Sequence, residues 1–161
     1  PRIHQIQKSQ NHITILSSAK DIMIYPIVAY GTPVLKKVAQ NIEIGEDLSQ
    51  LISDMFETMD QANGIGLAAP QINKPIRLFI IDTTNTDEDD EKKKVKKAFI
   101  NAQIIEETGE EWAFEEGCLS IPEVHADVLR YERIRMRYFD ENWKQKEEVF
   151  DGIMARVIQH E

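Results

Sequence analysis

The sequence has 161 residues, a net charge of −9, 42% hydrophobic and 29% charged residues. This composition fits one globular domain with a sizeable core. It excludes a membrane span, because no apolar run approaches ~18 residues, and it excludes a surface built mainly for nucleic-acid phosphates. The single cysteine, Cys118, excludes an internal disulfide and indicates a reducing, cytoplasmic location.

The first 22 residues are polar and show no periodicity. We interpret residues 1–22 as an N-terminal extension or arm, and residues 23–161 as a single domain. The arm carries no secretory signal, because it lacks a continuous apolar core and a small-residue cleavage site.

Two helices are predicted in the first half of the domain. Thr32 and Pro33 open a short helix, because Thr caps a helix N-terminus and Pro suits its first position. Leu35 and Val38 are expected to face the core. A longer helix is predicted over Asp47–Ala62, where Leu, Ile and Met recur at the i, i+3, i+4 spacing of one helix face.

A Gly-rich stretch, Asn63–Gln71, follows the longer helix. Its Gly-x-Gly-x-x-Ala pattern occurs in dinucleotide-binding turns, which follow a strand and open a helix. Here a helix precedes the pattern, and Pro70 disfavours a helix running through Ala69, which argues against that reading. The two glycines instead indicate backbone that another group approaches closely.

Strands are predicted from Arg77 onward. Arg77–Asp82 is an apolar run typical of a buried strand. Thr83–Lys97 has a block of acids followed by lysines, and we interpret it as a charged insertion that forms a solvated hairpin or mobile loop. Strand-like sequence resumes at Ala98–Ile100, and short strands with a turn at residues 140–142 are predicted within Val128–Phe150.

The last stretch, Gly152–Glu161, predicts a helix with an apolar stripe. Helices and antiparallel strand patterns do not alternate strictly, which favours an α+β fold over a doubly wound sheet. We expect antiparallel or mixed strands packed around this central helix. It ends on His160 and Glu161, the first half of a metal-binding His-Glu-x-x-His motif.

The cysteine lies in Glu115–Pro122, which has a loop-like sequence. A lone cysteine is most often a small buried apolar residue. However, three segments occur in the order of the motifs of the peptide deformylase family, which the chain closely resembles: Gly64–Gln71, Glu116–Ser120 and Gln159–Glu161. The first two motifs are complete, and the third is cut after its Glu.

The resemblance covers residues 23–161 and implies a catalytic domain. It implies removal of the N-formyl group from the N-terminal formyl-methionine of new polypeptides, in the cytoplasm and near the nascent-chain exit of the ribosome. It also implies one divalent metal, Fe(II) in many members, with Zn(II), Ni(II) or Co(II) also accommodated. The implied ligands are Cys118, His160 and a second His that the sequence lacks. Such a set leaves a tetrahedral position open for water.

The remaining site residues follow from the same resemblance. Glu161 is implied to carry the proton from water to the leaving amine. The Gln71 amide and the backbone N–H of Leu119 are implied to hold the oxyanion. The substrate peptide is implied to add as a strand and to place its Met side chain in an apolar pocket. The backbone implied to bind it is that of Ile65, Gly66 and Gly117.

Two alternatives stay open. A cysteine hydrolase would use Cys118 as nucleophile and His160 as base, but it leaves Glu161 and the Gly-rich stretch unexplained. The missing second His motivates the other, a catalytically inactive homologue or truncated form that only binds peptides. We favour a simpler explanation of that gap, namely that the sequence omits a C-terminal tail encoded by the gene.

Overall fold

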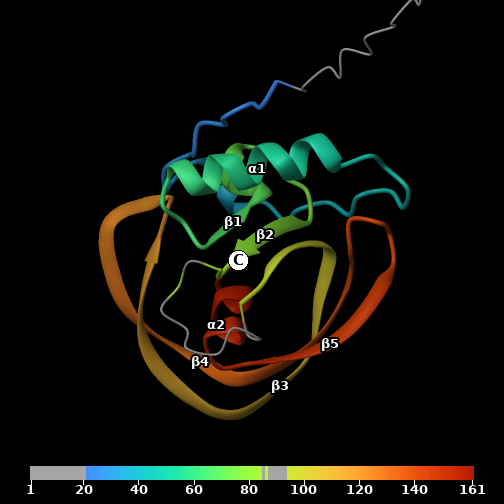
Figure 1. Ribbon diagram of the computed structural model, residues 1–161. Helices are drawn as coiled ribbons and strands as arrows, with labels where there is room; N and C mark the ends of the chain where they lie inside the picture. The colour runs from blue at the N-terminus through green and yellow to red at the C-terminus, as the bar shows by residue number, and fades with distance from the viewer. Residues whose placement is uncertain (1–20, 85, 87–93) are drawn as a thin grey trace, which may run out of the picture.

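Figure 1 shows the computed structural model, which describes residues 21–84, 86 and 94–161. The strands are β1 (Gly66–Ala68), β2 (Leu78–Asp82), β3 (Lys96–Cys118), β4 (Ile121–Phe139) and β5 (Gln145–Asp151). The α-helices are α1 (Ser49–Gln61) and α2 (Gly152–His160), and the 3-10 helices are η1 (Pro33–Lys36) and η2 (Ala69–Ile72). Among the described residues, no helix has the length and apolar character to cross a bilayer.

The five strands form one sheet in the order β1-β2-β3-β4-β5, and each strand pairs antiparallel with the next. An isolated parallel bridge joins Gln40 to Ile76 outside these strands. Strands β3, β4 and β5 curve around α2, whereas α1 lies beside β1 and β2 (Figure 1). The predicted α+β fold, with strands packed around the C-terminal helix, is confirmed.

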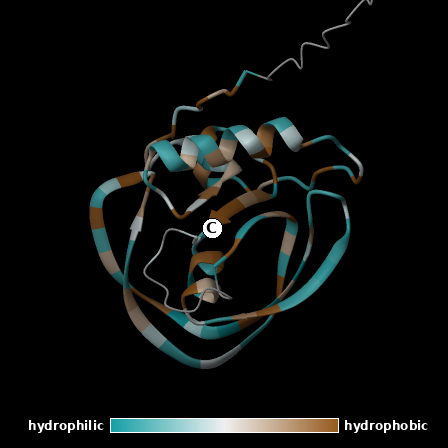
Figure 2. Ribbon diagram, viewed as in Figure 1, coloured by the Kyte–Doolittle hydropathy of each residue, from teal (hydrophilic) through white to brown (hydrophobic). Residues whose placement is uncertain are grey.

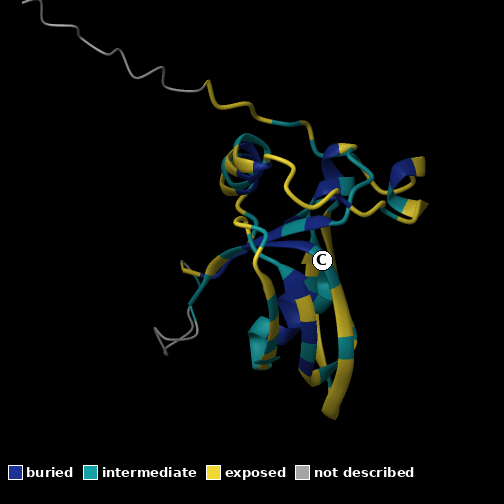
Figure 3. Cartoon of the chain, turned by 90° about the vertical axis from the view of Figure 1, so that its right-hand side faces the viewer, coloured by how far each residue is buried: buried dark blue, intermediate teal, exposed yellow. Residues whose placement is uncertain are grey.

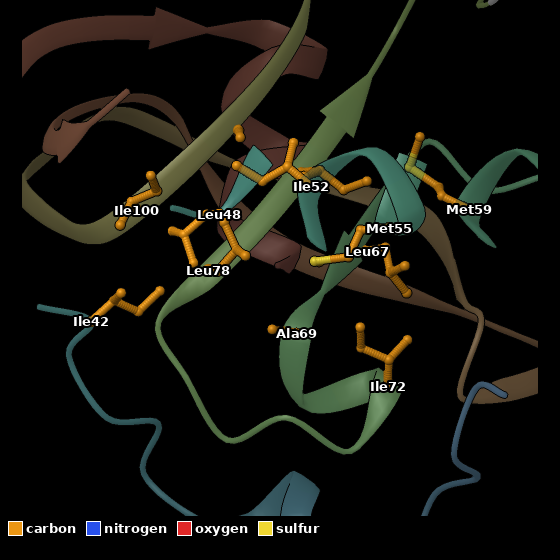
Figure 4. Packing of buried hydrophobic residues seen from close by; sticks show 12 residues of the cluster. Ile42, Leu48, Ile52, Met55, Met59, Leu67, Ala69, Ile72, Leu78 and Ile100 are labelled. Carbon is orange, nitrogen blue, oxygen red and sulfur yellow. The ribbon is translucent and has the colours of Figure 1, made fainter. Parts of the chain in front are cut away.

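Strand β2 separates two hydrophobic cores, because successive side chains of a strand point to opposite faces of the sheet. Leu78 and Ile80 join the core under α1, the α1-side core, while Phe79 and Ile81 pack in the core around α2, the α2-side core. The other buried residues of the α2-side core are Phe99, Ile134, Met136, Tyr138, Ala155, Val157 and Ile158. Both faces of β2 are therefore covered, which explains its unbroken apolar sequence; Figure 2 shows this run in brown. Figure 4 shows the α1-side core, formed by Ile42, Leu48, Ile52, Met55, Met59, Leu67, Ala69, Ile72, Leu78, Ile80, Ala98 and Ile100.

The predicted long helix is observed as α1. Ile52, Met55 and Met59, from its predicted apolar stripe, are buried in the α1-side core. A side chain of α1 binds the backbone of the segment at residue 23: Met23 donates its N–H to Asp54 Oδ1 at 3.0 Å. The arm predicted over residues 1–22 lies outside the described residues up to position 20.

The short helix differs from the prediction. Val38 is 92% exposed, and Val34 takes the buried position at 7%. The reason is that η1 is one 3-10 turn of four residues that stops at Lys36, so no helical face extends to position 38.

The strands of the second half are longer than predicted. Strand β3 has 23 residues and β4 has 19, and their pairing contains four register shifts that bend the hairpin. The strands predicted before the turn at residues 140–142 are thus segments of two long ones, whereas the strand predicted after that turn is observed as the separate β5. Figure 3 shows how exposed positions run along the two long strands. The expected loop over Glu115–Pro122 is wrong: Cys118 ends β3, and only Leu119 and Ser120 separate it from β4.

The charged insertion is shorter than the predicted Thr83–Lys97. Thr83 is buried and exchanges hydrogen bonds with Val95, from Thr83 N–H to the Val95 carbonyl at 2.9 Å and from Val95 N–H to Thr83 Oγ1 at 3.0 Å. Lys96 and Lys97 already belong to β3. Thr83 and Val95 therefore continue the pairing of β2 with β3 just beyond Asp82 and Lys96, while positions 85 and 87–93 lie outside the described residues.

Asp82 fixes the end of β2 to the start of β3. Its Oδ1 accepts hydrogen bonds from the N–H and the hydroxyl of Thr84, and its Oδ2 lies 3.0 Å from Lys96 Nζ. Burial alone would raise the pKa of this carboxyl, but the bonds from Thr84 and Lys96 lower it below its usual 3.8.

We predict that Asp82→Asn destabilises the protein most at neutral pH. A carboxyl with a lowered pKa stabilises the fold above its unfolded pKa, and this contribution is lost as the pH falls through the folded value. The difference in thermal midpoint between wild type and variant should therefore shrink below pH 3.8. Asp127→Asn, at an exposed position of β4, is the matched control. A difference that is the same at every pH would contradict this role of Asp82.

Candidate active site

A cavity of about 650 Å³ lies between the Gly-rich segment, the β3–β4 turn and α2. These three segments are far apart in sequence, and the sheet brings them together around the C-terminus marked in Figure 1. Every site residue predicted from the sequence lines this cavity: Ile65, Gly66, Gln71, Gly117, Cys118, Leu119, His160 and Glu161.

The side-chain amide of Gln71 has a fixed orientation. Its Oε1 accepts the N–H of Ala68 at 2.8 Å, which turns the NH2 group toward Ser120 Oγ at 3.3 Å and Cys118 Sγ at 3.8 Å. Gln71 is 8% exposed and lies in η2, which begins at Ala69 and accommodates Pro70 in its first turn. A proline near the start of a helix therefore did not prevent a helical turn here.

The two glycines allow the close approach that the sequence indicated. A Cβ at Gly64 would lie 2.7 Å from Leu119 Cδ1, and a Cβ at Gly66 would lie 2.8 Å from the carboxyl carbon of Glu161. Real Cβ atoms do not tolerate such distances, so neither position accepts a larger residue without a shift. The approaching groups are side chains of the protein itself, one from the β3–β4 turn and one from the end of α2.

His160 is oriented by Glu116. The His160 Nδ1 lies 2.8 Å from Glu116 Oε2. Burial alone would raise the pKa of the Glu116 carboxyl, but hydrogen bonds from Arg130, His160 and Arg156 lower it to about 2. An ionised carboxylate only accepts hydrogen bonds, so Nδ1 carries the proton and Nε2 of a neutral ring remains free to bind a metal.

Two arginines complete the surroundings of Glu116. Arg130 donates hydrogen bonds to both carboxylate oxygens, from Nε to Oε1 at 2.7 Å and from Nη2 to Oε2 at 2.8 Å. Its Nη1 donates to the Gln159 carbonyl at 3.0 Å. Arg156, 3% exposed, donates from Nη1 to Glu116 Oε1 at 2.6 Å. No role was predicted for Glu116 or Arg156 from the sequence. The available signal was helical spacing, because Arg156 precedes His160 by four positions and shares its helix face.

Glu161 follows the last helical residue of α2 and places its carboxyl against Gly66. Burial raises the pKa of this carboxyl to about 8, and the charge of Arg130 lowers it by a smaller amount. A cation bound beside it would lower the pKa further. A carboxyl that titrates near neutral pH can both accept and donate a proton within one reaction cycle.

The donors in the cavity suit a borderline or soft divalent cation. Cys118 offers a thiol and His160 an imidazole, and both line the same space. Such ligands favour Fe(II), Zn(II) or Ni(II) over Mg(II) or Ca(II). Within the part of the chain that the structure describes, no group of three or more His, Cys, Asp or Glu side chains could hold a metal ion. The residues present thus fit two positions of a metal site.

The chain matches known deformylases in sequence. The sequence profile of the family described as Polypeptide deformylase matches residues 24–161. A peptide deformylase of Cytophaga hutchinsonii is 60% identical over 140 residues, which cover 86% of this chain and 76% of that protein. A peptide deformylase of Christiangramia forsetii is 55% identical over 148 residues, with the same two shares.

The chain also matches known deformylases in structure. The crystal structure of peptide deformylase from Thermotoga maritima is 38% identical with a TM-score of 0.77, and the match covers 86% of this chain and 89% of that one. A class I type b peptide deformylase from Acinetobacter baumannii, with Met-Ala-Ser bound, is 29% identical with a TM-score of 0.77, covering 86% and 91%. Motifs, fold and cavity agree with these matches, and the chain belongs to the polypeptide deformylase family.

Proposed function

We propose that the protein removes the N-formyl group from the N-terminal formyl-methionine of newly made polypeptides, as a metal-dependent amide hydrolase of the cytoplasm. One observation carries this proposal: side chains of Gln71, Cys118, His160 and Glu161, from three distant segments, line one cavity. The family of the chain supports the reaction type. We also propose that the protein acts near the nascent-chain exit of the ribosome.

Cys118 and His160 would hold the cation, with Fe(II) as our first choice and Zn(II) or Ni(II) as alternatives. A bound divalent cation supplies a Lewis acid and lowers the pKa of water, so that hydroxide is available near neutral pH. The hydrogen bond from His160 Nδ1 to Glu116 leaves Nε2 for this purpose. Two protein donors are fewer than a stable site needs. The proposal therefore requires at least one more donor besides Cys118 and His160, and the described residues do not supply a group of three.

The proton and the oxyanion have separate partners in the cavity. The Glu161 carboxylate takes the proton of the attacking water and passes it to the leaving amine nitrogen. The NH2 group of Gln71 and the N–H of Leu119 donate to the formyl oxygen as negative charge develops on it. Loss of one such donor typically costs about 3 kcal/mol of transition-state stabilisation. The Ala68 N–H fixes the Gln71 amide in the required orientation.

The substrate peptide has an open sheet edge to bind. Strand β1 is one of the two edge strands, and among the strands of the described residues it pairs only with β2. We propose that the backbone at Ile65, Gly66 and Gly117 pairs with the peptide, as in strand addition. The apolar side chains that line the cavity beside α2 would receive the Met side chain; they are Phe114, Ile153 and Val157. The Met-Ala-Ser bound to the Acinetobacter relative matches the expected type of product.

The direct test is release of formate from formyl-Met-Ala by the full-length protein loaded with Fe(II) under anaerobic conditions. Acetyl-Met-Ala is the matched control, because its extra methyl group should not fit a site built for a formyl group. We expect formate from the first peptide only. If formyl-Met-Ala binds but stays intact, the protein is a peptide-binding module and the proposal fails.

Cys118→Ser and Glu161→Gln should separate the metal ligand from the proton carrier. A neutral hydroxyl is a poor ligand for these metals, so Cys118→Ser should lose most of the bound metal. Glu161→Gln should keep the metal and lose nearly all turnover. Elemental analysis and formate release measure the two effects. A Cys118→Ser variant that keeps its metal but loses activity would instead indicate a cysteine nucleophile.

Gly66→Ala should displace the Glu161 carboxyl, because the added Cβ overlaps it. We expect a loss of turnover and a destabilisation of about 1–3 kcal/mol, as for other overpacked sites. The double variant Gly66→Ala/Glu161→Ala should recover the stability of Glu161→Ala alone, because the clash is gone, while staying inactive. Denaturant unfolding of wild type, the two single variants and the double variant gives the free energies of this double-mutant cycle. Purely additive losses would mean that the two residues do not contact each other.

A further inference from the structure

Arg156 connects α2 to both strands of the β3–β4 hairpin. Its Nη2 donates to the Trp112 carbonyl of β3 at 2.5 Å, and its Nη1 donates to the Val128 carbonyl of β4 at 2.9 Å. The same Nη1 reaches Glu116 Oε1 at 2.6 Å. One guanidinium thus contacts two backbone carbonyls and the carboxylate that orients His160.

The position of the guanidinium is also defined by aromatic rings. Its central carbon lies 4.2 Å from the ring centroid of Trp112 and 5.5 Å from that of Phe114. Every second residue of this part of β3 points to the face that meets α2. These residues are Trp112, Phe114 and Glu116. A planar, forked cation fits this arrangement of flat rings and spread acceptors, whereas a lysine ammonium does not.

Stability alone does not account for Arg156. Burying a charge is costly, and a buried ion pair is therefore weak evidence for a stabilising role. The Arg156 Nε is buried and has no hydrogen-bond partner among the residues that the structure describes, which adds to the cost. Without Arg156 the Glu116 charge would still be paired, because Arg130 binds both of its oxygens. The buried arginine therefore has another use.

We propose that Arg156 is a positioning residue that fixes His160 relative to Cys118. Glu116 lies two residues before Cys118 on β3, and Arg156 lies one turn before His160 on α2. The contacts of Arg156 therefore set the distance between the strand that carries the thiol and the helix that carries the imidazole. Its bond to Glu116 Oε1 also keeps the carboxylate turned so that Oε2 faces His160 Nδ1. This inference rests on the proposed function, in which both side chains are metal ligands.

The test compares Arg156→Met, Arg156→Lys and Ile158→Ala with wild type, each as the full-length protein substituted with Co(II). Ile158 lies on α2 in the α2-side core, 4% exposed, and its truncation controls for lost stability. The measurements are Co(II) affinity by chelator competition, the visible spectrum of the bound Co(II), and the thermal midpoint. In the metal-free proteins, proton NMR follows the Nδ1–H of His160.

For Arg156→Met we expect Co(II) binding about tenfold weaker, as for other residues that orient a ligand. The visible spectrum should change, the slowly exchanging Nδ1–H signal of His160 should disappear, and the thermal midpoint should fall by no more than that of Ile158→Ala. Arg156→Lys should recover only part of the affinity, because an ammonium cannot reach all three acceptors. Ile158→Ala should lower the thermal midpoint and leave the affinity unchanged.

The proposal is overturned if Arg156→Met binds Co(II) within twofold of wild type. It is also overturned if Ile158→Ala, at a similar loss of thermal midpoint, loses as much Co(II) affinity as Arg156→Met does. Wild type that binds no Co(II) would overturn it as well. Wild type that binds Co(II) but leaves formyl-Met-Ala intact would refute the proposed function instead, and the spectra and the Nδ1–H signal would still decide the role of Arg156.

Discussion

The Glu116 carboxylate is the buried charge around which the cavity is arranged. It accepts four hydrogen bonds, from Arg130 on β4, from Arg156 and His160 on α2, and it stands near the end of β3. Each donor on this nearly buried carboxylate limits how its two oxygens can turn, so losing any one partner changes how the others are held. The relative positions of β3, β4 and α2 are therefore coupled through a single side chain.

The two hydrophobic cores support this arrangement from both sides of the sheet. The α1-side core holds β1 and the Gly-rich segment, while the α2-side core holds the helix that ends in His160 and Glu161. The cavity lies where these two halves meet, at the open edge of β1. Rigid elements rather than long loops thus carry the reactive groups, which suits a site that must align a small formyl group.

Sequence patterns predicted the parts of the fold that depend on short-range order. The stripe of α1, the apolar run of β2 and the start of α2 at Gly152 were all readable, because their periodicity is local. The bends of β3 and β4 were not, since a register shift depends on the partner strand. The resemblance to the family motifs predicted which residues line the cavity. The role of Arg156 was not predicted, because an arginine in a helix is ordinarily on the surface.

The contact between Gly66 and Glu161 has a consequence for how the protein folds. It closes a loop that contains most of the domain, so the cavity cannot form until the whole sheet and α2 have docked. Such non-local closure is slow compared with helix formation, and partly folded chains lack the site altogether. A ligand of the cavity therefore binds only the complete fold and stabilises it by mass action, which makes ligand-induced thermal shift a measure of completed folding.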